Sequence, residues 1–280
     1  MMTFSILIAN YNNGKFFKNC YDSIISQKYT NWEVIILDDC STDNSLELIN
    51  GLIKDDSRFK LFENEVNCGV GITKAKLIEL ANGEICGFVD PDDGISPDAL
   101  LSSITVFTKS KDVVLTYSKF VKCDDNLQPL EIPKLAMQVP NGDPYFFNCP
   151  VHIVHFVSFR KDVYLQTEKM NTIMRIAEDQ DLYLKMYEKG KVKFINENNY
   201  LYRTHSGGIS QNENRPKSRE YFAQVIFNAM KRRKLTTING KKVPETYTNS
   251  KEIYNLLDYQ TSIFYRFKKK LKILIQTAFS

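Results

Sequence analysis

The sequence predicts an α/β protein with a mixed, mainly parallel sheet flanked by helices. Three observations support this fold class. Short apolar runs alternate with stretches of helical periodicity through the first hundred residues, as in strand and helix units of a parallel sheet. Acidic residues follow two of these runs directly, at Asp38 and Asp90. The 280 residues are 43% hydrophobic and 25% charged, which is typical of a globular chain with a substantial core.

The first half contains the regular elements. Phe17, Cys20, Ile24 and Ile25 recur at helical spacing and predict an amphipathic helix. The expected order is strand 4–9, helix 15–27, strand 33–37, a helix ending near 53, strand 59–62, helix 72–81 and strand 85–89.

The second half is less regular from about Val113 onward. Isolated strands are expected at 113–117, 151–159 and 192–195, separated by loops rich in Pro and Asn. His152 and His155 would lie on opposite faces of the middle strand, so we interpret both as structural or acceptor-facing residues. A helix is expected to begin at Glu178.

The C-terminal part, residues 216–280, is predicted to be a basic, mostly helical extension. It carries fourteen Lys and Arg against four Asp and Glu, whereas the whole chain has a net charge of +4. Residues 264–275 mix aromatic, aliphatic and cationic side chains, as an interfacial helix does. They predict docking on an anionic membrane surface; the alternative is a helix packed on the core with a solvated lysine face.

Localisation is expected to be cytoplasmic, and peripheral on the inner face of the membrane if the basic helix docks there. No charged and apolar leader precedes Ser5, and no run reaches the roughly 18 apolar residues of a spanning helix. The six cysteines form no close pair in the sequence, which argues against a zinc cluster or a disulfide framework. We expect no nucleic acid among the partners.

Two acidic clusters are expected at the carboxyl ends of parallel strands, where open α/β sheets bind ligands. They are Asp38-Asp39 and the run 90–93, DPDD. Like charges this close favour a divalent cation, although a polar turn would use the same residues. One cluster can accept hydrogen bonds from a base or ribose while the other holds a metal on a diphosphate, as a nucleotide-sugar site requires.

The chain resembles family 2 glycosyltransferases over roughly residues 3–210. The segments that carry the resemblance are 5–12 (SILIANYN), 32–43 (WEVIILDDCSTD) and 90–93 (DPDD). The resemblance implies a GT-A type, Rossmann-like fold. It also implies a nucleotide-sugar-binding half at 1–110, an acceptor-binding and catalytic half of the same domain at 111–215, and the extension at 216–280.

The resemblance assigns donor contacts to five positions. Ala9 and Tyr11 would line the uracil and ribose pocket, and Asp39 would hydrogen-bond the uracil ring. Asp90 would lie near the ribose, and Asp92 would bind the metal, Mn²⁺ or Mg²⁺.

Lys74 stands where the family usually has the Arg of an Arg-Asn pair, within a segment similar to the family's Asn-x-Gly loop and following helix. It could reach the base or a phosphate as a point charge. The alternative is a solvated helix lysine.

The resemblance also implies the catalytic groups. Asp179 would be the base that deprotonates the acceptor hydroxyl, with Glu178 beside it, although acidic residues are common at helix starts. Residues 202–210 resemble a loop that closes over the diphosphate. Arg203 would counter the phosphate charge, and His205 would complete the metal sphere.

The implied activity is inverting transfer of a hexose or N-acetylhexosamine, from a nucleotide sugar such as a UDP-sugar to a glycan or lipid-linked acceptor, as in surface polysaccharide synthesis. One alternative is a nucleotidyltransferase that makes sugar nucleotides; such an enzyme would need a Gly-rich phosphate loop after the first strand, and residues 10–14 lack one. Another is a non-catalytic, membrane-docked nucleotide-binding module.

Overall fold

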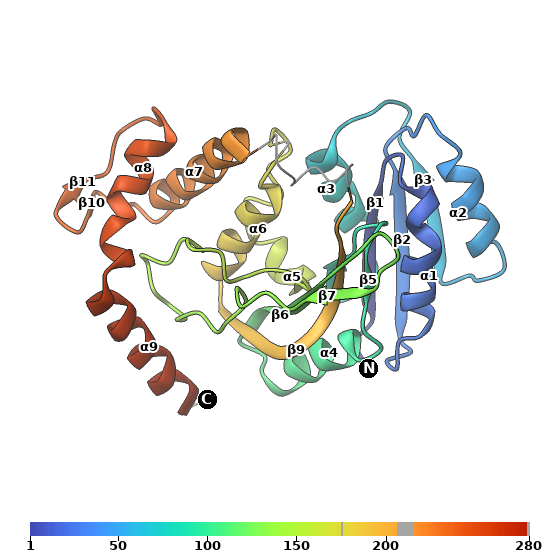
Figure 1. Ribbon diagram of the computed structural model, residues 1–280, viewed down its shortest axis with the longest axis horizontal. Coiled ribbons are helices and arrows are strands. Elements are labelled where there is room, and N and C mark those ends of the chain that lie inside the picture. Colours follow the sequence, from blue (N-terminus) through green and yellow to red (C-terminus); the bar gives the residue numbers. More distant parts are fainter. Residues whose placement is uncertain (175, 206–214, 279–280) are drawn as a thin grey trace.

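One curled sheet organises the fold (Figure 1). In this computed structural model, which describes residues 1–174, 176–205 and 215–278, nine strands form the sheet in the order β3-β2-β1-β4-β8-β6-β9-β5, with β7 paired to β6. The strands are β1 (Phe4–Asn10), β2 (Trp32–Asp38), β3 (Phe59–Glu63), β4 (Ile85–Phe88), β5 (Gly94–Ile95), β6 (Val113–Cys123), β7 (Pro129–Glu131), β8 (Ser158–Arg160) and β9 (Lys191–Arg203). The predicted mixed α/β fold is therefore confirmed.

The first four strands pair in parallel, and their side chains feed two hydrophobic cores on opposite faces of the sheet. Ile6 and Ile8 of β1 pack in the core that includes α1, α2 and α4, whereas Leu7 packs in the core that includes α3. The helices of this half are α1 (Phe17–Ile25), α2 (Ser45–Ile53), α3 (Val70–Leu80) and α4 (Ala99–Lys109), with the 3₁₀ turn η1 (Gly14–Phe16) before α1. β1, β2 and β4 are buried on both faces and read as nearly continuous apolar runs, whereas β3 is mostly exposed. The sequence located all four strands to within one residue at each end.

The second half mixes directions: β8 is antiparallel to β4 and β6, while β6 and β9 are parallel. The predicted strand 151–159 is wrong, because only Ser158–Arg160 is a strand. The side chain of Asn148 accepts hydrogen bonds from the backbone N–H groups of His152 and Ile153, both at 2.9 Å, so these groups pair with a side chain instead of a sheet neighbour. The histidines therefore do not lie on two faces of a strand.

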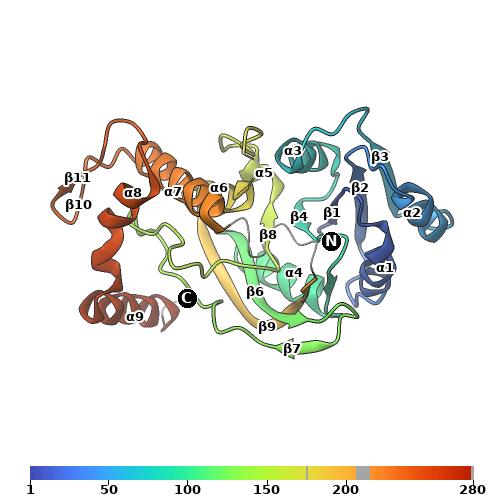
Figure 2. The same cartoon turned by 45° about the horizontal axis from the view of Figure 1, so that its top comes forward.

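The C-terminal helices lie at the end of the molecule opposite α1 and α2 (Figures 1 and 2). The helices from the middle of the chain onward are α5 (Lys161–Tyr164), α6 (Glu178–Tyr187), α7 (Arg215–Arg232), α8 (Ser250–Leu257) and α9 (Ile263–Ala278), with η3 (Asp258–Thr261) before α9 and the hairpin β10 (Thr237–Ile238) and β11 (Lys241–Lys242) before α8. Ala223, Ile226 and Met230 of α7 are buried in the core that α6 and α8 share. The predicted basic helical extension is confirmed. Within the described ranges, none of the helices combines the length and hydrophobicity needed to cross a bilayer.

Candidate functional site

A cavity of about 580 Å³ opens where β1, β2 and β4 end and where α3 and α6 begin. Its wall includes every residue that the sequence placed in the site: Ala9, Tyr11, Asp39, Lys74, Asp90, Asp92, Glu178, Asp179, Arg203 and His205. The first half of the chain contributes the acidic strand ends, and the second half contributes the start of α6 and the end of β9. The structure thus brings together residues that lie far apart in the sequence.

Asp38 and Asp39, at the end of β2, are both buried and bind different neighbours. The Asp38 carboxylate accepts hydrogen bonds from Asn10 Nδ2 at 2.6 Å and from the Ser41 backbone N–H at 2.7 Å. The Asp39 carboxylate accepts from the backbone N–H groups of Cys68 and Gly69, both at 2.8 Å. Asp39 therefore fixes the loop that leads into α3 at the cavity wall.

The loop from Asp90 to Asp93 concentrates negative charge in a poorly solvated place. Burial, followed by the charge of Asp90, raises the pKa of Asp92. Burial and the charges of Asp90 and Asp92 raise the pKa of Asp93 in the same way. Tyr200 of β9 accepts a hydrogen bond from the Asp90 backbone N–H at 3.2 Å and so holds the start of the loop. The loop is arranged to receive positive charge.

Arg203 and His205 bring the end of β9 against this loop. The buried Arg203 guanidinium donates to the Asp92 backbone oxygen at 2.6 Å, to the Asp125 backbone oxygen, and to Asn19 Oδ1 at 3.1 Å. These contacts hold the acidic loop in place. His205 Nε2 lies 2.9 Å from Asp92 Oδ2. The later residues of the predicted loop, 206–210, lie outside the described residues.

The first turn of α6 places Glu178 and Asp179 opposite α3. Lys74 of α3 forms a 2.7 Å ion pair with Glu178, and the two side chains are only 12% and 8% exposed. Burial lowers the pKa of Lys74, but the charges of Glu178, Asp90 and Asp179 outweigh it and leave the pKa above its ordinary value. Burial, followed by the charge of Glu178, raises the pKa of Asp179 to about 6. Asp179 can therefore exchange a proton near neutral pH.

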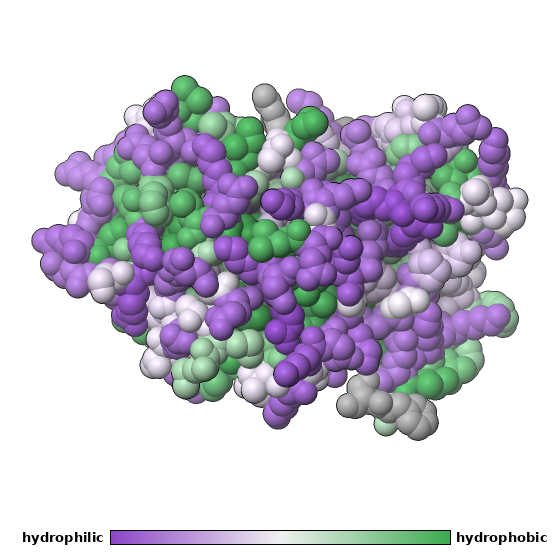
Figure 3. All heavy atoms as spheres, turned by 180° about the vertical axis from the view of Figure 1, so that it is seen from behind, coloured by the Kyte–Doolittle hydropathy of each residue, from purple (hydrophilic) through white to green (hydrophobic). Residues whose placement is uncertain are grey.

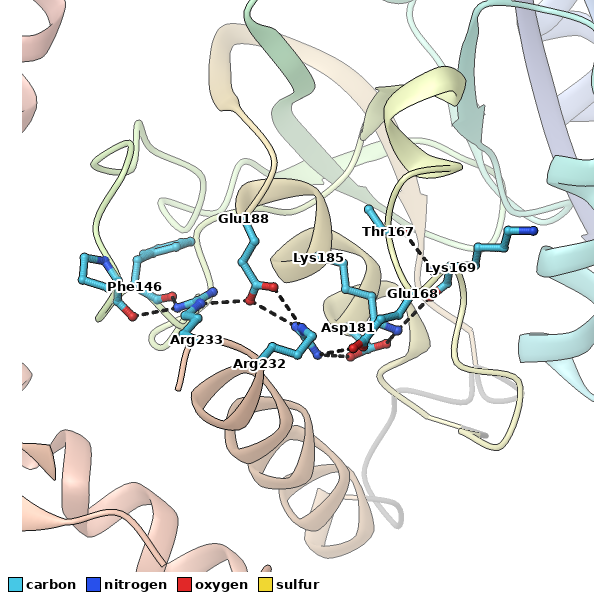
Figure 4. Close-up of polar contacts among 10 residues, drawn as sticks. Phe146, Thr167, Glu168, Lys169, Asp181, Lys185, Glu188, Arg232 and Arg233 are labelled. Carbon is cyan, nitrogen blue, oxygen red and sulfur yellow. Dashed lines mark hydrogen bonds and ion pairs between the residues drawn. The ribbon is translucent and has the colours of Figure 1, made fainter. Parts of the chain in front are cut away.

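A partly buried charge network fixes α6 to α7 and to two loops (Figure 4). Arg232 contacts Asp181 at 3.4 Å and Glu188 at 2.9 Å, and Lys185 contacts Asp181 at 2.5 Å. Arg233 joins Glu188, at 2.9 Å, to the backbone oxygen of Phe146. Because the network spans the helix that carries Glu178 and Asp179, it holds their turn in place relative to the C-terminal extension.

Asp92 and His205 provide donor atoms that suit a divalent cation. Asp92 Oδ2 and His205 Nε2 are adjacent, 2.9 Å apart, and carboxylate oxygen and imidazole nitrogen are both ligands of divalent cations in proteins. In the described ranges, no three His, Cys, Asp or Glu side chains gather into a complete site. Mg²⁺ commonly uses one or two carboxylates together with substrate phosphates and water, so the pair fits a cation shared with a diphosphate.

The wall also includes residues beyond the predicted donor, metal and catalytic groups. His155 stacks on Tyr200 with 4.6 Å between the ring centroids, and burial lowers its pKa, so it contributes a neutral aromatic wall. Tyr202 and Ile176 also line the cavity. Tyr202 belongs to the loop 202–210 that the resemblance predicted, and His155 was interpreted as structural or acceptor-facing. Nothing in the local sequence pointed to Ile176.

Comparison with known proteins gives a consistent result. The family model described as "Glycosyl transferase family 2" matches residues 5–166. The glycosyltransferase GlyG of Streptococcus pneumoniae is 30% identical over 75% of this chain and 73% of its own length. A chondroitin synthase of Pasteurella multocida is 27% identical over 92% of this chain, and this chain spans only 26% of that protein.

Solved structures share the fold at low sequence identity. TarS (residues 1–349) of Staphylococcus aureus, solved in complex with UDP-GlcNAc, has a TM-score of 0.69 and 19% identity, covering 98% of this chain and 78% of that one. The mannosyltransferase PcManGT of Pyrobaculum calidifontis, in complex with GDP-Man and Mn²⁺, has a TM-score of 0.63 and 16% identity, covering 91% and 69%. The predicted GT-A type fold is confirmed by these neighbours.

Proposed function

Because the chain belongs to glycosyl transferase family 2, we propose that it is an inverting enzyme that transfers a hexosyl or N-acetylhexosaminyl group from a UDP-sugar. The acceptor is a glycan or a lipid-linked saccharide, and the product belongs to surface polysaccharide synthesis. Relatives named as a chondroitin synthase and a structural neighbour solved with UDP-GlcNAc support this choice of substrates. Family membership disfavours the nucleotidyltransferase alternative.

One observation supports the proposal most strongly: two acidic groups, the loop 90–93 and Asp179, line the same cavity but have different surroundings. The loop 90–93 lies beside His205 and the end of β9, whereas Asp179 lies beside the Lys74–Glu178 ion pair. Groups whose surroundings differ in this way can take different roles in one reaction. We assign the donor diphosphate to the first group and the acceptor hydroxyl to the second.

In the proposed reaction, Asp179 accepts the proton of the acceptor hydroxyl. The acceptor oxygen bonds to the anomeric carbon of the sugar as the bond to the diphosphate breaks, and the nucleoside diphosphate leaves with the electron pair. A pKa of about 6 leaves Asp179 ionised at neutral pH, while keeping it more basic than an ordinary aspartate. Glu178 takes part through its ion pair, which holds the first turn of α6 against α3.

The nucleotide is proposed to bind along Ala9, Tyr11 and Asp39, with Asp90 near the ribose. Asp39 uses both carboxylate oxygens on the loop before α3, so its contact to uracil would use the remaining lone pairs. Arg203 binds Asp92 and Asp125 through their backbone oxygens, so we propose that it positions the acidic loop at the diphosphate.

Asp92 and His205 are proposed to hold Mn²⁺ or Mg²⁺. The bound cation would neutralise charge on the diphosphate and so improve it as a leaving group. A neighbour with the same fold was solved with Mn²⁺. An anionic membrane surface, met through residues 264–275, is proposed as a further partner, since lipid-linked acceptors reside in membranes.

Calorimetric titration tests the donor site. UDP, GDP, CDP and dTDP are titrated into the full chain with and without Mn²⁺, and the same titrations are repeated with Asp92→Ala. Metal-dependent binding of UDP that the variant loses is the expected result. Asp162→Ala, at an exposed position in α5, is the matched control and should bind as the unmodified protein does.

The alternatives give different results. Preferential binding of another nucleotide would keep the enzyme class and refute the role of Asp39 in reading uracil. Binding of UDP without donor hydrolysis or transfer to any saccharide acceptor would favour a non-catalytic nucleotide-binding module.

A further inference from the structure

Helix α9 presents its apolar side to solvent. Its exposed apolar side chains are Ile263 (86%), Phe264 (69%), Phe267 (65%), Leu271 (48%), Leu274 (66%) and Ile275 (52%). At 3.6 residues per turn these positions form one stripe along the helix. In Figure 3, which views the molecule from behind, hydrophobic side chains gather at the lower right edge, where α9 ends.

The side of α9 that contacts the rest of the protein is polar. Lys272 forms an ion pair with Asp143 at 3.4 Å, and Gln276 exchanges two hydrogen bonds of 2.9 Å with the backbone of Asn141. Lys269 lies over the ring of Phe146 at 5.9 Å. With Tyr265, which packs edge-on against Tyr259, the contacting positions recur at 265, 269, 272 and 276, one helical face.

This orientation is the reverse of that of an ordinary surface helix, which buries its apolar stripe. No residue of α9 is buried, although polar contacts place it against the 141–146 segment. A contiguous apolar stripe left in water marks an interaction surface. The question is which occupant fits the stripe.

The charges beside the stripe favour an anionic lipid surface. Arg266, Lys268 and Lys270 are exposed, and the helical repeat places them on the two flanks of the stripe. The α9 sequence, IFYRFKKKLKILIQTA, contains no Asp or Glu. A second copy packed stripe to stripe would bring these cations together without compensating carboxylates, whereas anionic headgroups would pair with them at the depth where the apolar side chains enter the acyl region.

We infer that α9 lies in the plane of an anionic membrane, with Phe264, Phe267, Leu271 and Leu274 inserted at the level of the headgroups and the flanking cations bound to lipid phosphates. The polar contacts to Asn141 and Asp143 then fix the catalytic body to the docked helix. This inference deepens the membrane contact proposed above by naming the side chains that make it. It does not depend on sugar transfer, because docking is measured without catalysis.

Co-sedimentation of the full chain with vesicles tests the inference. The vesicles are phosphatidylcholine alone or phosphatidylcholine mixed with phosphatidylglycerol, at low and high salt. We expect binding to the anionic vesicles that weakens with salt. Each cation near the surface contributes about fivefold in affinity, so Lys268→Gln/Lys270→Gln should weaken binding about 25-fold. The triple change Phe267→Glu, Leu271→Glu and Leu274→Glu should abolish it.

Two controls keep the result interpretable. Lys241→Gln/Lys242→Gln removes the same charge from the exposed hairpin, away from α9, and should bind as the unmodified protein does. Because none of the substituted side chains is buried, the midpoint of thermal unfolding should stay unchanged in each variant.

Other outcomes would overturn the inference. Failure of the unmodified chain to bind anionic vesicles, or equal binding by the triple variant, would exclude docking through this stripe. A dimer in light scattering that the triple variant converts to a monomer, without vesicle binding by either protein, would assign the stripe to a second copy. If the protein bound free inorganic phosphate as well as vesicles, and the apolar substitutions had no effect, the surface would be a phosphate-binding site and not a membrane-docking site.

Discussion

Replacing Lys74 by Met tests whether this residue serves the nucleotide or the base. The family resemblance placed Lys74 beside the donor, whereas the structure pairs its ammonium with Glu178 at 2.7 Å. Burial and the charge of Glu178 raise the pKa of Asp179, and the charge of Lys74 lowers it. Without Lys74, the pKa of Asp179 should therefore rise above about 6.

The size of the effect follows from these surroundings. With a pKa of about 6, roughly nine tenths of Asp179 is ionised at pH 7, and a rise of about one unit would leave roughly half ionised. Loss of one partner from a buried ion pair lowers the free energy of unfolding by about 3–5 kcal/mol. Because the Lys74–Glu178 pair borders the cavity, we expect a loss near or below the lower end of this range. We expect the lower ionised fraction alone to reduce kcat at pH 7 by about twofold, with a further loss as the first turn of α6 loosens.

The assay is sugar transfer, or donor hydrolysis, measured from about pH 5 to 8.5 for the unmodified chain, Lys74→Met and Lys74→Arg. The acid limb of kcat should move to higher pH in Lys74→Met and return toward its original position in Lys74→Arg. The dissociation constant of UDP should change little in either variant. A Lys74→Met protein that loses UDP binding while its acid limb stays near pH 6 would refute this reasoning and restore the nucleotide role.

Three further predictions concern stability, measured by urea unfolding. Asp179→Asn should abolish transfer but stabilise the fold by about 1–3 kcal/mol at pH 8, because the raised pKa of about 6 makes ionised Asp179 costly; the gain should vanish toward pH 4. Glu33→Gln should lower the free energy of unfolding by about 2–3 kcal/mol at pH 7. Burial raises the pKa of Glu33, but its hydrogen bonds outweigh burial and lower the pKa to about 2. The difference between the two proteins should therefore shrink as the pH falls below about 4.5. Gly71→Ala should cost about 1–3 kcal/mol, because its Cβ would lie 2.8 Å from the Met174 backbone oxygen. The matched control for this last change is Gly51→Ala, whose Cβ would meet nothing within 4 Å and which should be neutral or stabilising.

The parallel half of the fold could be predicted because its signals are local. β1, β2 and β4 are nearly continuous apolar runs, and acidic residues follow β2 and β4 directly, so these two strands and their candidate ligands appear together in the sequence. The strand expected at 151–159 shows the limit of this reasoning. Its apolar composition is that of a strand, but the side chain of Asn148 accepts hydrogen bonds from the backbone N–H groups of His152 and Ile153. A pattern of apolar residues does not predict such a side-chain contact.

The site residues could be named from the sequence, but their contacts could not. Lys74 and Glu178 are 104 residues apart, so their ion pair depends on how α3 and α6 pack. Arg203 shows the same limit: its guanidinium reaches Asp125, in the turn after β6, and Asn19 of α1, and no motif connects either residue to β9. Motifs gave the residue types that the chemistry needs, and the packing of distant elements decided which groups each side chain contacts.

The balance of charge in the cavity bears on the order of binding. Asp90, Asp92 and Asp93 lie together, and burial beside like charges raises the pKa of the last two. The nearby cations are already engaged, Lys74 with Glu178 and Arg203 with backbone oxygens. A nucleoside diphosphate that enters this cavity alone would add negative charge to a wall that already carries an excess of it. We therefore expect the donor to bind together with a divalent cation, because the cation offsets the repulsion from both the acidic loop and the diphosphate.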